Sequence, residues 1–171
     1  AWIPEGTERE LTREPWASFI RDGLLTVTDG DTTDTDAIYS TMQEVVETYQ
    51  VQSLAFDPAN AREFSVRCFN EWQIPLVEMY QNCRNFNEPT RGFAEALRKG
   101  LINHGNNGLL SWCAKNVAIK EDSNEYQMPF KLKSREKIDP IVALIMAYRQ
   151  CMTADSDFVR DYYEENELEV A

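Results

Sequence analysis

Residues 53–60 read SLAFDPAN, a short apolar run that ends in an Asp-Pro pair. The run from Ser53 to Phe56 predicts a short buried strand, and the helical spacing of apolar residues over 59–72 predicts a helix directly after it. A strand that leads into a helix places Asp57 at the carboxyl edge of a sheet, where α/β proteins usually bind their ligands. The role of the Asp57 carboxylate is therefore the main question that this sequence raises.

Strands and helices are expected to alternate along most of the chain. The patterns predict strands at 24–28, 53–56, 75–80, 101–105 and 116–120. They predict helices at 12–22, 36–50, 59–72, 89–99 and 109–114, and a strongly apolar helix that Asp139 and Pro140 open. This order predicts an α/β fold with a mostly parallel sheet and helices on its faces.

Two helix details follow from the same patterns. Asp36 is the expected N-cap of helix 36–50, and Gly100 is the expected stop of helix 89–99. The buried side of helix 59–72 is expected to carry Phe64, Cys68, Phe69 and Trp72.

The length and composition indicate one ordinary domain. The chain has 171 residues, of which 43% are hydrophobic, and this is enough for a substantial core. We expect a domain over 1–151 and an acidic, weakly ordered tail over 152–171, because residues 155–169 hold seven acids and one base. No long apolar run or signal-like start is present, so we expect a soluble, intracellular protein; the absence of an initiating Met suggests a piece of a longer polypeptide.

The cysteine and histidine content argues against zinc and disulfides. The four cysteines contain no C-x-x-C pair, and His104 is the only histidine. We therefore expect reduced thiols and no zinc site.

Two carboxylates stand at boundaries between elements and next to apolar residues. Asp57 ends a strand, and Asp139 begins the apolar helix. A carboxylate in such a place must be capped, paired or bound to a metal to offset its desolvation. Each residue taken alone also fits a simpler interpretation, Asp57 as a turn residue before Pro58 and Asp139 as an N-cap. The acids of 29–36 are interpreted as turn and cap residues.

Four stretches occur in a distinctive order, namely LAFDPANA at 54–61, LRKGLINHGNNGLLSW at 97–112, NVAIKED at 116–122 and SREKIDPIVALIMA at 134–147. This series resembles the C-terminal nuclease domain of tailed-phage terminase large subunits, in which short motifs of these kinds recur with similar spacing. The resemblance covers roughly Pro4 to Ala147.

The resemblance implies a ribonuclease H-like fold, a mixed sheet flanked by helices, and a metal-dependent endonuclease that cuts concatemeric double-stranded viral DNA. By motif position, Asp57 and Asp139 correspond to two members of the family's acidic metal cluster. Clustered carboxylates suit two Mg²⁺ or Mn²⁺ ions, which activate water and stabilise the leaving oxygen in phosphodiester hydrolysis.

One ligand of that family cluster has no counterpart in this sequence. The family carries a further Asp on the first strand of its sheet, and this chain begins downstream of the place where that strand is expected. We therefore expect a domain that lacks its first strand or strands, weak metal binding by this chain alone, and possible inactivity of the isolated chain.

Three further assignments accompany the acids. His104 stands where the family has His-Gly-Gly-Asn, with Asn106 replacing the second glycine, and is either a hydrogen-bonded loop residue or a phosphate contact. Asn60 matches the family's Asn and either orients Asp57 or caps the following helix. A basic stretch is either a solvated face or a set of contacts to DNA phosphates, and it comprises Lys131, Lys133, Arg135 and Lys137.

The resemblance also implies partners and a location. The implied partners are double-stranded DNA, the small terminase subunit and the portal protein. The implied location is the cytoplasm of an infected or prophage-carrying bacterium, with no membrane association and no place in the virion. No G-x-x-x-x-G-K-[ST] loop occurs, so ATP hydrolysis by this chain is not expected.

Two other function classes compete with the nuclease. In a non-catalytic interaction domain, Asp57 and Asp139 would only cap turns, and the acidic tail would dock a basic partner. A nucleotide-binding doubly wound domain is disfavoured because no Gly-rich loop follows the first strand.

Overall fold

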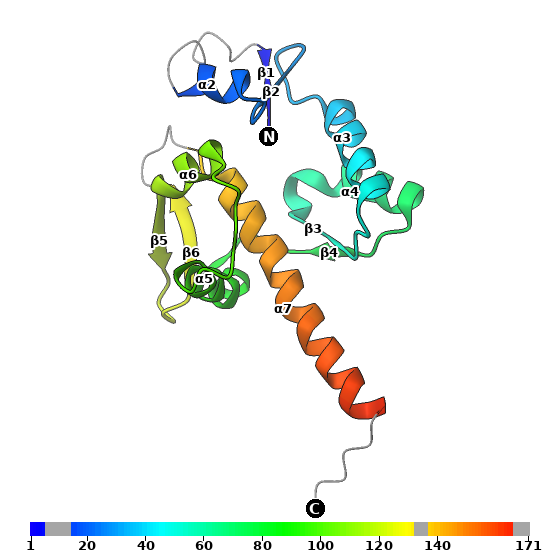
Figure 1. Cartoon of the computed structure of the whole chain (residues 1–171), viewed down its shortest axis with the longest axis vertical. Helices are drawn as coiled ribbons and strands as arrows, with labels where there is room; N and C mark the ends of the chain where they lie inside the picture. Colours follow the sequence, from blue (N-terminus) through cyan, green and yellow to red (C-terminus); the bar gives the residue numbers. More distant parts are fainter. Residues whose placement is uncertain (6–14, 132–136, 166–171) are drawn as a thin grey trace, which may run out of the picture.

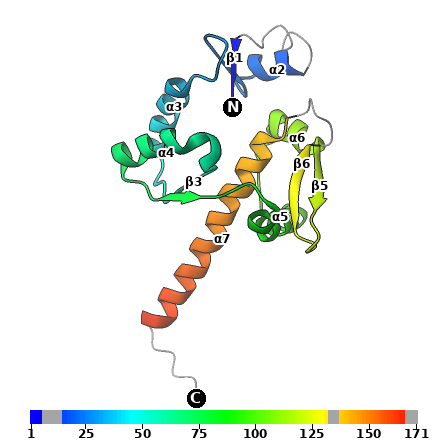
Figure 2. The same ribbon diagram turned by 180° about the vertical axis from the view of Figure 1, so that it is seen from behind.

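The long helix α7 (Asp139–Glu165) organises the computed structural model, which describes residues 1–5, 15–131 and 137–165. Figure 1 shows α5 (Cys83–Arg98), α6 (Gly108–Lys115) and the hairpin of β5 (Val117–Glu121) and β6 (Gln127–Lys131) on one side of this helix. Figure 2 shows from behind that α3 (Thr35–Thr48), α4 (Pro58–Trp72), β3 (Leu54–Phe56) and β4 (Leu76–Glu78) lie on its other side. The short elements β1 (Trp2–Pro4), α2 (Trp16–Arg21) and β2 (Thr26–Thr28) lie near the N-terminal end of α7.

The strands of the described residues form three two-stranded ladders. β1 pairs with β2 and β3 pairs with β4, both in parallel, whereas β5 and β6 pair antiparallel. The β3, α4, β4 unit is the expected crossover, with Leu54 opposite Leu76 and Phe56 opposite Glu78. The fold is therefore the predicted mixed α/β arrangement, although the parallel pairs do not share one ladder in the part that the structure describes.

One apolar core joins the elements around α7. It contains Phe19, Leu25, Met79, Phe86, Phe93, Leu109, Cys113, Ile141, Ile145 and Met146. Burial of large side chains such as Phe86, which has no exposed surface, stabilises a fold by about 2 to 3 kcal/mol each. The first turns of α7 contribute Ile141, Ile145 and Met146, so the core fixes where α7 begins.

A smaller aromatic contact joins α3 to α4. The rings of Tyr39 and Trp72 stack at 4.7 Å, and the guanidinium of Arg67 lies 3.7 Å from the centre of the Tyr39 ring. Phe69, expected on the buried side of α4, is instead 42% exposed, whereas Cys68 is fully buried as expected.

The start of α5 differs from the expectation. The helix begins at Cys83, where the Asn82 side chain caps it, and not at Pro89. Pro89 lies inside the helix and lacks the N–H that would bond to the carbonyl of Asn85. Arg149 of α7 donates to that carbonyl at 3.5 Å, which compensates for part of the loss.

Two further local expectations are wrong. Residues 101–105 are not a strand, because Gly105 and Asn106 take φ values of 61° and 56° that end any extended run. The N-cap of α3 is Asp34 and not Asp36, since the Asp34 side chain accepts from the backbone N–H groups of Asp36 and Ala37.

α7 is longer than the apolar segment that predicted it. The helix runs through Glu165, past the residue at which we expected a weakly ordered acidic tail to begin. The division into 1–151 and 152–171 stays a prediction.

Cys113 of α6 lies in the core without exposed surface. Burial, with a further contribution from the negative charge of Asp139, raises the pKa of the Cys113 thiol to about 11. An unfolded thiol loses its proton near pH 9, so the folded protein holds this proton over a pH range in which the unfolded chain does not.

We predict that stability falls by roughly 2 kcal/mol between pH 9 and pH 11 because of this thiol, and that this contribution is fully present below pH 9. Urea unfolding of Cys113→Ala should show a shallower decline with pH, and Asp139→Asn should lower the pKa of Cys113. Cys151→Ala, at an exposed cysteine, is the control and should keep the decline. Equal pH dependence in Cys113→Ala and the unmodified protein would contradict this account.

Candidate functional site

Asp57 lies directly after β3 and is the N-cap of α4. Its backbone is extended, with φ −86° and ψ 114°, and one carboxylate oxygen, Oδ1, accepts from the N–H of Ala59 at 3.1 Å. Pro58 occupies the first turn, where its missing N–H costs nothing. This bond agrees with the simpler interpretation of Asp57 as a turn residue before Pro58. A carboxylate has about four lone-pair positions, however, so one such bond leaves room for another ligand.

Asp139 opens α7 and is exposed. The carbonyl of Ile138 accepts from the N–H groups of Ile141 and Val142, so Asp139 lies in the first helical turn, one residue after the N-cap position. Asn116, at the end of α6, donates to the carbonyl of Lys137 at 3.5 Å and ties this entry point to α6. Burial first, and then the negative charge of Asp139, raise the pKa of the Cys113 thiol of α6.

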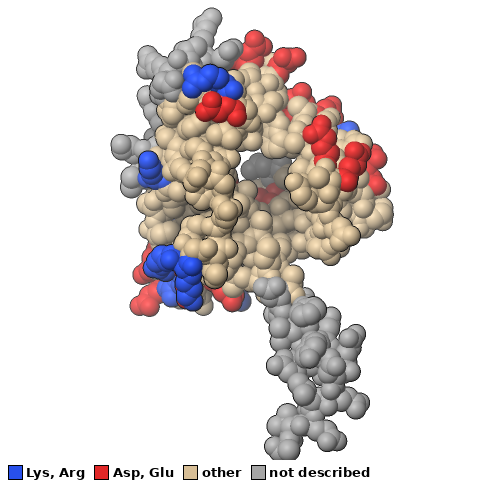
Figure 3. Space-filling model, viewed as in Figure 1, with Lys and Arg blue, Asp and Glu red and all other residues tan. Residues whose placement is uncertain are grey.

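The elements that carry the two acids pack against each other. α7 contacts β3, and Ala55 of β3 packs against the core that contains Ile141 of α7. Figure 3 shows that the surface is hollowed between the side formed by α7 and the side formed by α3 and α4. Asp57 and Asp139 therefore stand at the ends of neighbouring elements.

Both acids also stand at helix N-termini. The first N–H groups of α4 and α7 point away from their helices, and the helix dipoles make these ends partly positive. Such ends stabilise carboxylates and also favour phosphate groups. The local field at each of these helix ends thus suits an anion close to a carboxylate.

Glu78 is a further acid at the same edge, and the sequence patterns did not single it out. It ends β4 opposite Phe56 and is exposed. Its Oε1 accepts from Arg62 at 2.8 Å and its Oε2 accepts from the Tyr80 hydroxyl at 3.2 Å. Arg62 and Tyr80 already offset the charge of Glu78, so the main role of Glu78 is to link α4 to β4. The signal that could have found it was its place as the one acid within the strand expected at 75–80.

His104 lies in the turn between α5 and α6 and is exposed. The N–H of Asn107 donates to the His104 carbonyl at 3.1 Å, and the N–H of Gly105 donates to the Asn103 side chain at 2.9 Å. Asn106 takes the left-handed conformation that a glycine would accept readily, and asparagine tolerates it better than most residues. The departure from His-Gly-Gly-Asn therefore leaves the turn intact. The imidazole lines an apolar pocket whose other walls include α5, α6 and α7.

The remaining site candidates are placed only in part. Asn60 lies inside the first turn of α4, so it is not the N-cap, and its side chain lies outside the described part. Lys131 ends β6 and Lys137 is exposed just before α7. Lys133 and Arg135 lie outside the described residues.

The charge pattern of the surface is uneven. Figure 3 shows acidic side chains over the region of α3, and cationic side chains with acidic ones beside them over the region of α5. Within the described residues, no group of three or more His, Cys, Asp or Glu side chains is arranged to hold a metal ion. In the same residues, no helix is long and apolar enough to cross a membrane.

Comparisons with known proteins give the family. The family model described as terminase large subunit, endonuclease domain, matches residues 3–155. Protein YmfN of Escherichia coli K12 is 30% identical over 173 residues, which cover 95% of this chain and 38% of that protein. The terminase large subunit of Enterobacteria phage HK97 is 27% identical over 150 residues, covering 85% of this chain and 30% of that protein.

A solved structure agrees with these relatives. The crystal structure of the HK97 bacteriophage large terminase superposes with a TM-score of 0.77 at 26% identity, over 86% of this chain and 32% of that one. The chain thus spans about a third of the length of the relatives that it matches. Its fold is the ribonuclease H-like fold of terminase nuclease domains, and the chain belongs to the family of terminase large subunit endonuclease domains.

Proposed function

We propose that this chain is the DNA-cleaving domain of a phage genome-packaging terminase, which hydrolyses phosphodiester bonds of concatemeric double-stranded DNA with divalent metal ions. The observation that carries the proposal is the placement of Asp57 and Asp139 at the ends of two packed elements, β3 and α7. The family match supports the reaction class.

The donor chemistry of these residues fits Mg²⁺ or Mn²⁺. Both ions prefer hard oxygen ligands, and two carboxylates supply such oxygens without histidine or cysteine. Asp57 and Asp139 would hold part of the ligand set, since the described residues contain no larger cluster. When bound, two such ions supply an activated water and stabilise the leaving oxygen.

The protein itself contributes orientation and charge. The Ala59 N–H holds the Asp57 carboxylate in one orientation, and the packing of Ile141 fixes the first turn of α7 and thus Asp139. In this proposal Asn60 orients Asp57, and His104 serves as a weaker candidate for a phosphate contact. The N-termini of α4 and α7 add positive potential for the DNA backbone.

DNA would be held by its phosphates. We assign these contacts to Lys131, Lys133, Arg135 and Lys137, which precede Asp139 closely in the chain. Contacts of this kind do not read bases, so partners would select the cutting sites; the resemblance points to the small terminase subunit and the portal. The site of action would be the cytoplasm of the infected bacterium.

The competing function is a non-catalytic interaction domain. The observation in its favour is that Asp57 caps α4, a role that requires no metal. Substitutions that keep the cap and remove the charge separate the two functions.

We predict that Asp57→Asn and Asp139→Asn each lower plasmid nicking with Mn²⁺ by about 100-fold, because about 2.7 kcal/mol of transition-state stabilisation is removed. Asparagine is a good N-cap, so the first of these variants should keep its melting temperature. The matched control is Asp34→Asn at the N-cap of α3, which should nick normally. The assay is run with this chain and with the full-length protein, and nicking that survives both site substitutions would rule out the assignment.

We predict that alanine substitution of the four basic residues weakens DNA binding equally for unrelated sequences. The slope of log affinity against log salt should become shallower by about 0.9 for each phosphate that a removed side chain had neutralised. Fluorescence anisotropy at several NaCl concentrations, without divalent metal, measures both effects. Lys99→Ala, which removes a cation paired with Glu95 on α5, is the control. An unchanged slope in the fourfold variant would show that these residues do not touch phosphates.

A further inference from the structure

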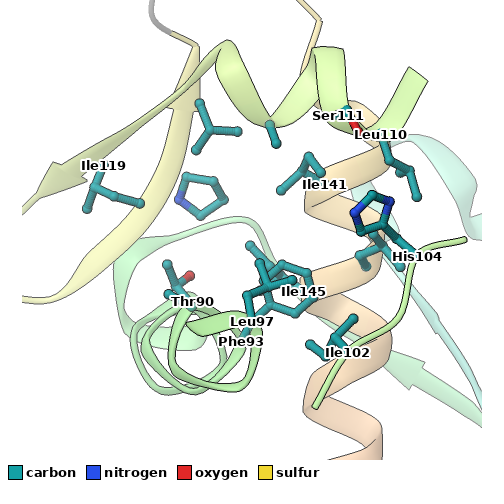
Figure 4. A pocket seen from close by; sticks show the side chains of 15 residues that line it. Thr90, Phe93, Leu97, Ile102, His104, Leu110, Ser111, Ile119, Ile141 and Ile145 are labelled. Carbon is teal, nitrogen blue, oxygen red and sulfur yellow. The ribbon is translucent and has the colours of Figure 1, made fainter. Parts of the chain in front are cut away.

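An apolar pocket lies between α5, α6, α7 and the β5–β6 hairpin, away from β3 and Asp57. Its volume is about 370 Å³, which falls in the range of small-molecule sites and exceeds the volume of a single side chain. Figure 4 shows Phe93 and Leu97 of α5, Ile119 of β5, and Ile141 and Ile145 of α7 around it. None of the residues that line it is Asp, Glu, Lys or Arg.

Thr90 is the unusual member of this lining. Its side chain lies on α5, across the pocket from His104, and the residue is only 5% exposed. Its hydroxyl has no hydrogen-bond partner in the described structure. Thr90 therefore presents a buried, unpaired polar atom to an apolar pocket.

Helical hydroxyls elsewhere in the chain behave differently. Thr41 donates to the carbonyl of Ala37 at 3.2 Å, Thr48 to that of Glu44 at 2.7 Å, and Ser111 to that of Asn107 at 3.0 Å. This bond to the carbonyl four residues earlier is the ordinary way to satisfy a hydroxyl inside a helix. Ser111 lines the same pocket, yet its hydroxyl is already paired.

An unpaired buried hydroxyl destabilises a fold, whereas valine has nearly the same shape and carries no such penalty. A threonine at this position is best explained by a partner atom that arrives with a ligand. The Thr90 hydroxyl is nearly inaccessible from outside the protein, so a partner atom must reach it from within the pocket that Thr90 lines. The lack of charged lining residues favours a neutral molecule.

We propose that this pocket binds a neutral, mainly apolar small molecule with an oxygen atom that accepts a hydrogen bond from the Thr90 hydroxyl. The site is separate from the acids assigned to DNA cleavage, and its occupancy requires neither metal nor DNA. The two proposals are independent: evidence against DNA cleavage would not affect the ligand proposal, and evidence against ligand binding would not affect the cleavage proposal.

The test compares two ring systems of almost equal size, 2-naphthol and naphthalene, whose affinities are measured by fluorescence titration. The unmodified chain should bind 2-naphthol about tenfold more tightly than naphthalene, as expected for one hydrogen bond to a buried hydroxyl. Thr90→Val should bind both probes with similar affinity, and its melting temperature should rise because the unpaired hydroxyl is gone.

A second experiment tests whether a side chain that fills the pocket prevents binding of the probes. Ala114→Phe places a large side chain in the lining and should reduce the affinity for both probes at least tenfold. Ala143→Phe adds the same side chain at an exposed position of α7 outside the lining and should leave both affinities unchanged. No detectable binding of either probe to the unmodified chain would overturn the proposal. An equal preference in the unmodified chain and Thr90→Val, or undiminished binding in Ala114→Phe, would also overturn it.

Discussion

The packing of α7 against β3, α5 and α6 is the contact on which the rest of the structure depends. Ile141, Ile145 and Met146 bury their side chains in the main core, and this burial fixes both the direction of α7 and its first residue. The same core holds Met79, directly after β4, and Ala55 of β3 packs on it. One apolar interaction thus positions two acids that are far apart in the sequence.

This arrangement explains how a capping residue and a candidate metal ligand can be the same side chain. The Ala59 N–H uses one acceptor position of Asp57 and restrains its rotamer, which lowers the entropy cost of binding an ion. Asp139 is exposed in the first turn of α7, where the helix dipole compensates its charge while no ion is bound. The two acids can therefore lie on neighbouring elements in the folded protein without a large penalty from mutual repulsion.

The sequence predicted the β3, α4, β4 unit well because its signals are local. An apolar run, an Asp-Pro pair and a helical pattern each depend on only a few residues, and the order of the short motifs resembles that of the family. Prediction from the sequence failed where contacts between distant elements override the local preference of the residues. Pro89 lies inside α5, where Arg149 on another helix compensates for part of the lost bond. Pro129 lies inside β6, a place where proline usually argues against a strand.

The sequence patterns could name the residues of the candidate site, but they could not predict how those residues are arranged in space. Sequence patterns named Asp57 and Asp139, yet they could not show that one caps α4 while the other stands past the N-cap position of α7. The partners of Glu78 and the unpaired hydroxyl of Thr90 depend on contacts between distant elements, so no local pattern could reveal them.

The central claim is that folding lets Asp57 and Asp139 share divalent cations. The most direct measurement is the anomalous scattering of crystals of this chain soaked in excess MnCl₂. The account predicts a manganese peak with carboxylate oxygens of both residues at about 2.1 to 2.2 Å, and its loss in Asp139→Asn. Manganese bound elsewhere, with neither carboxylate in contact, would contradict it.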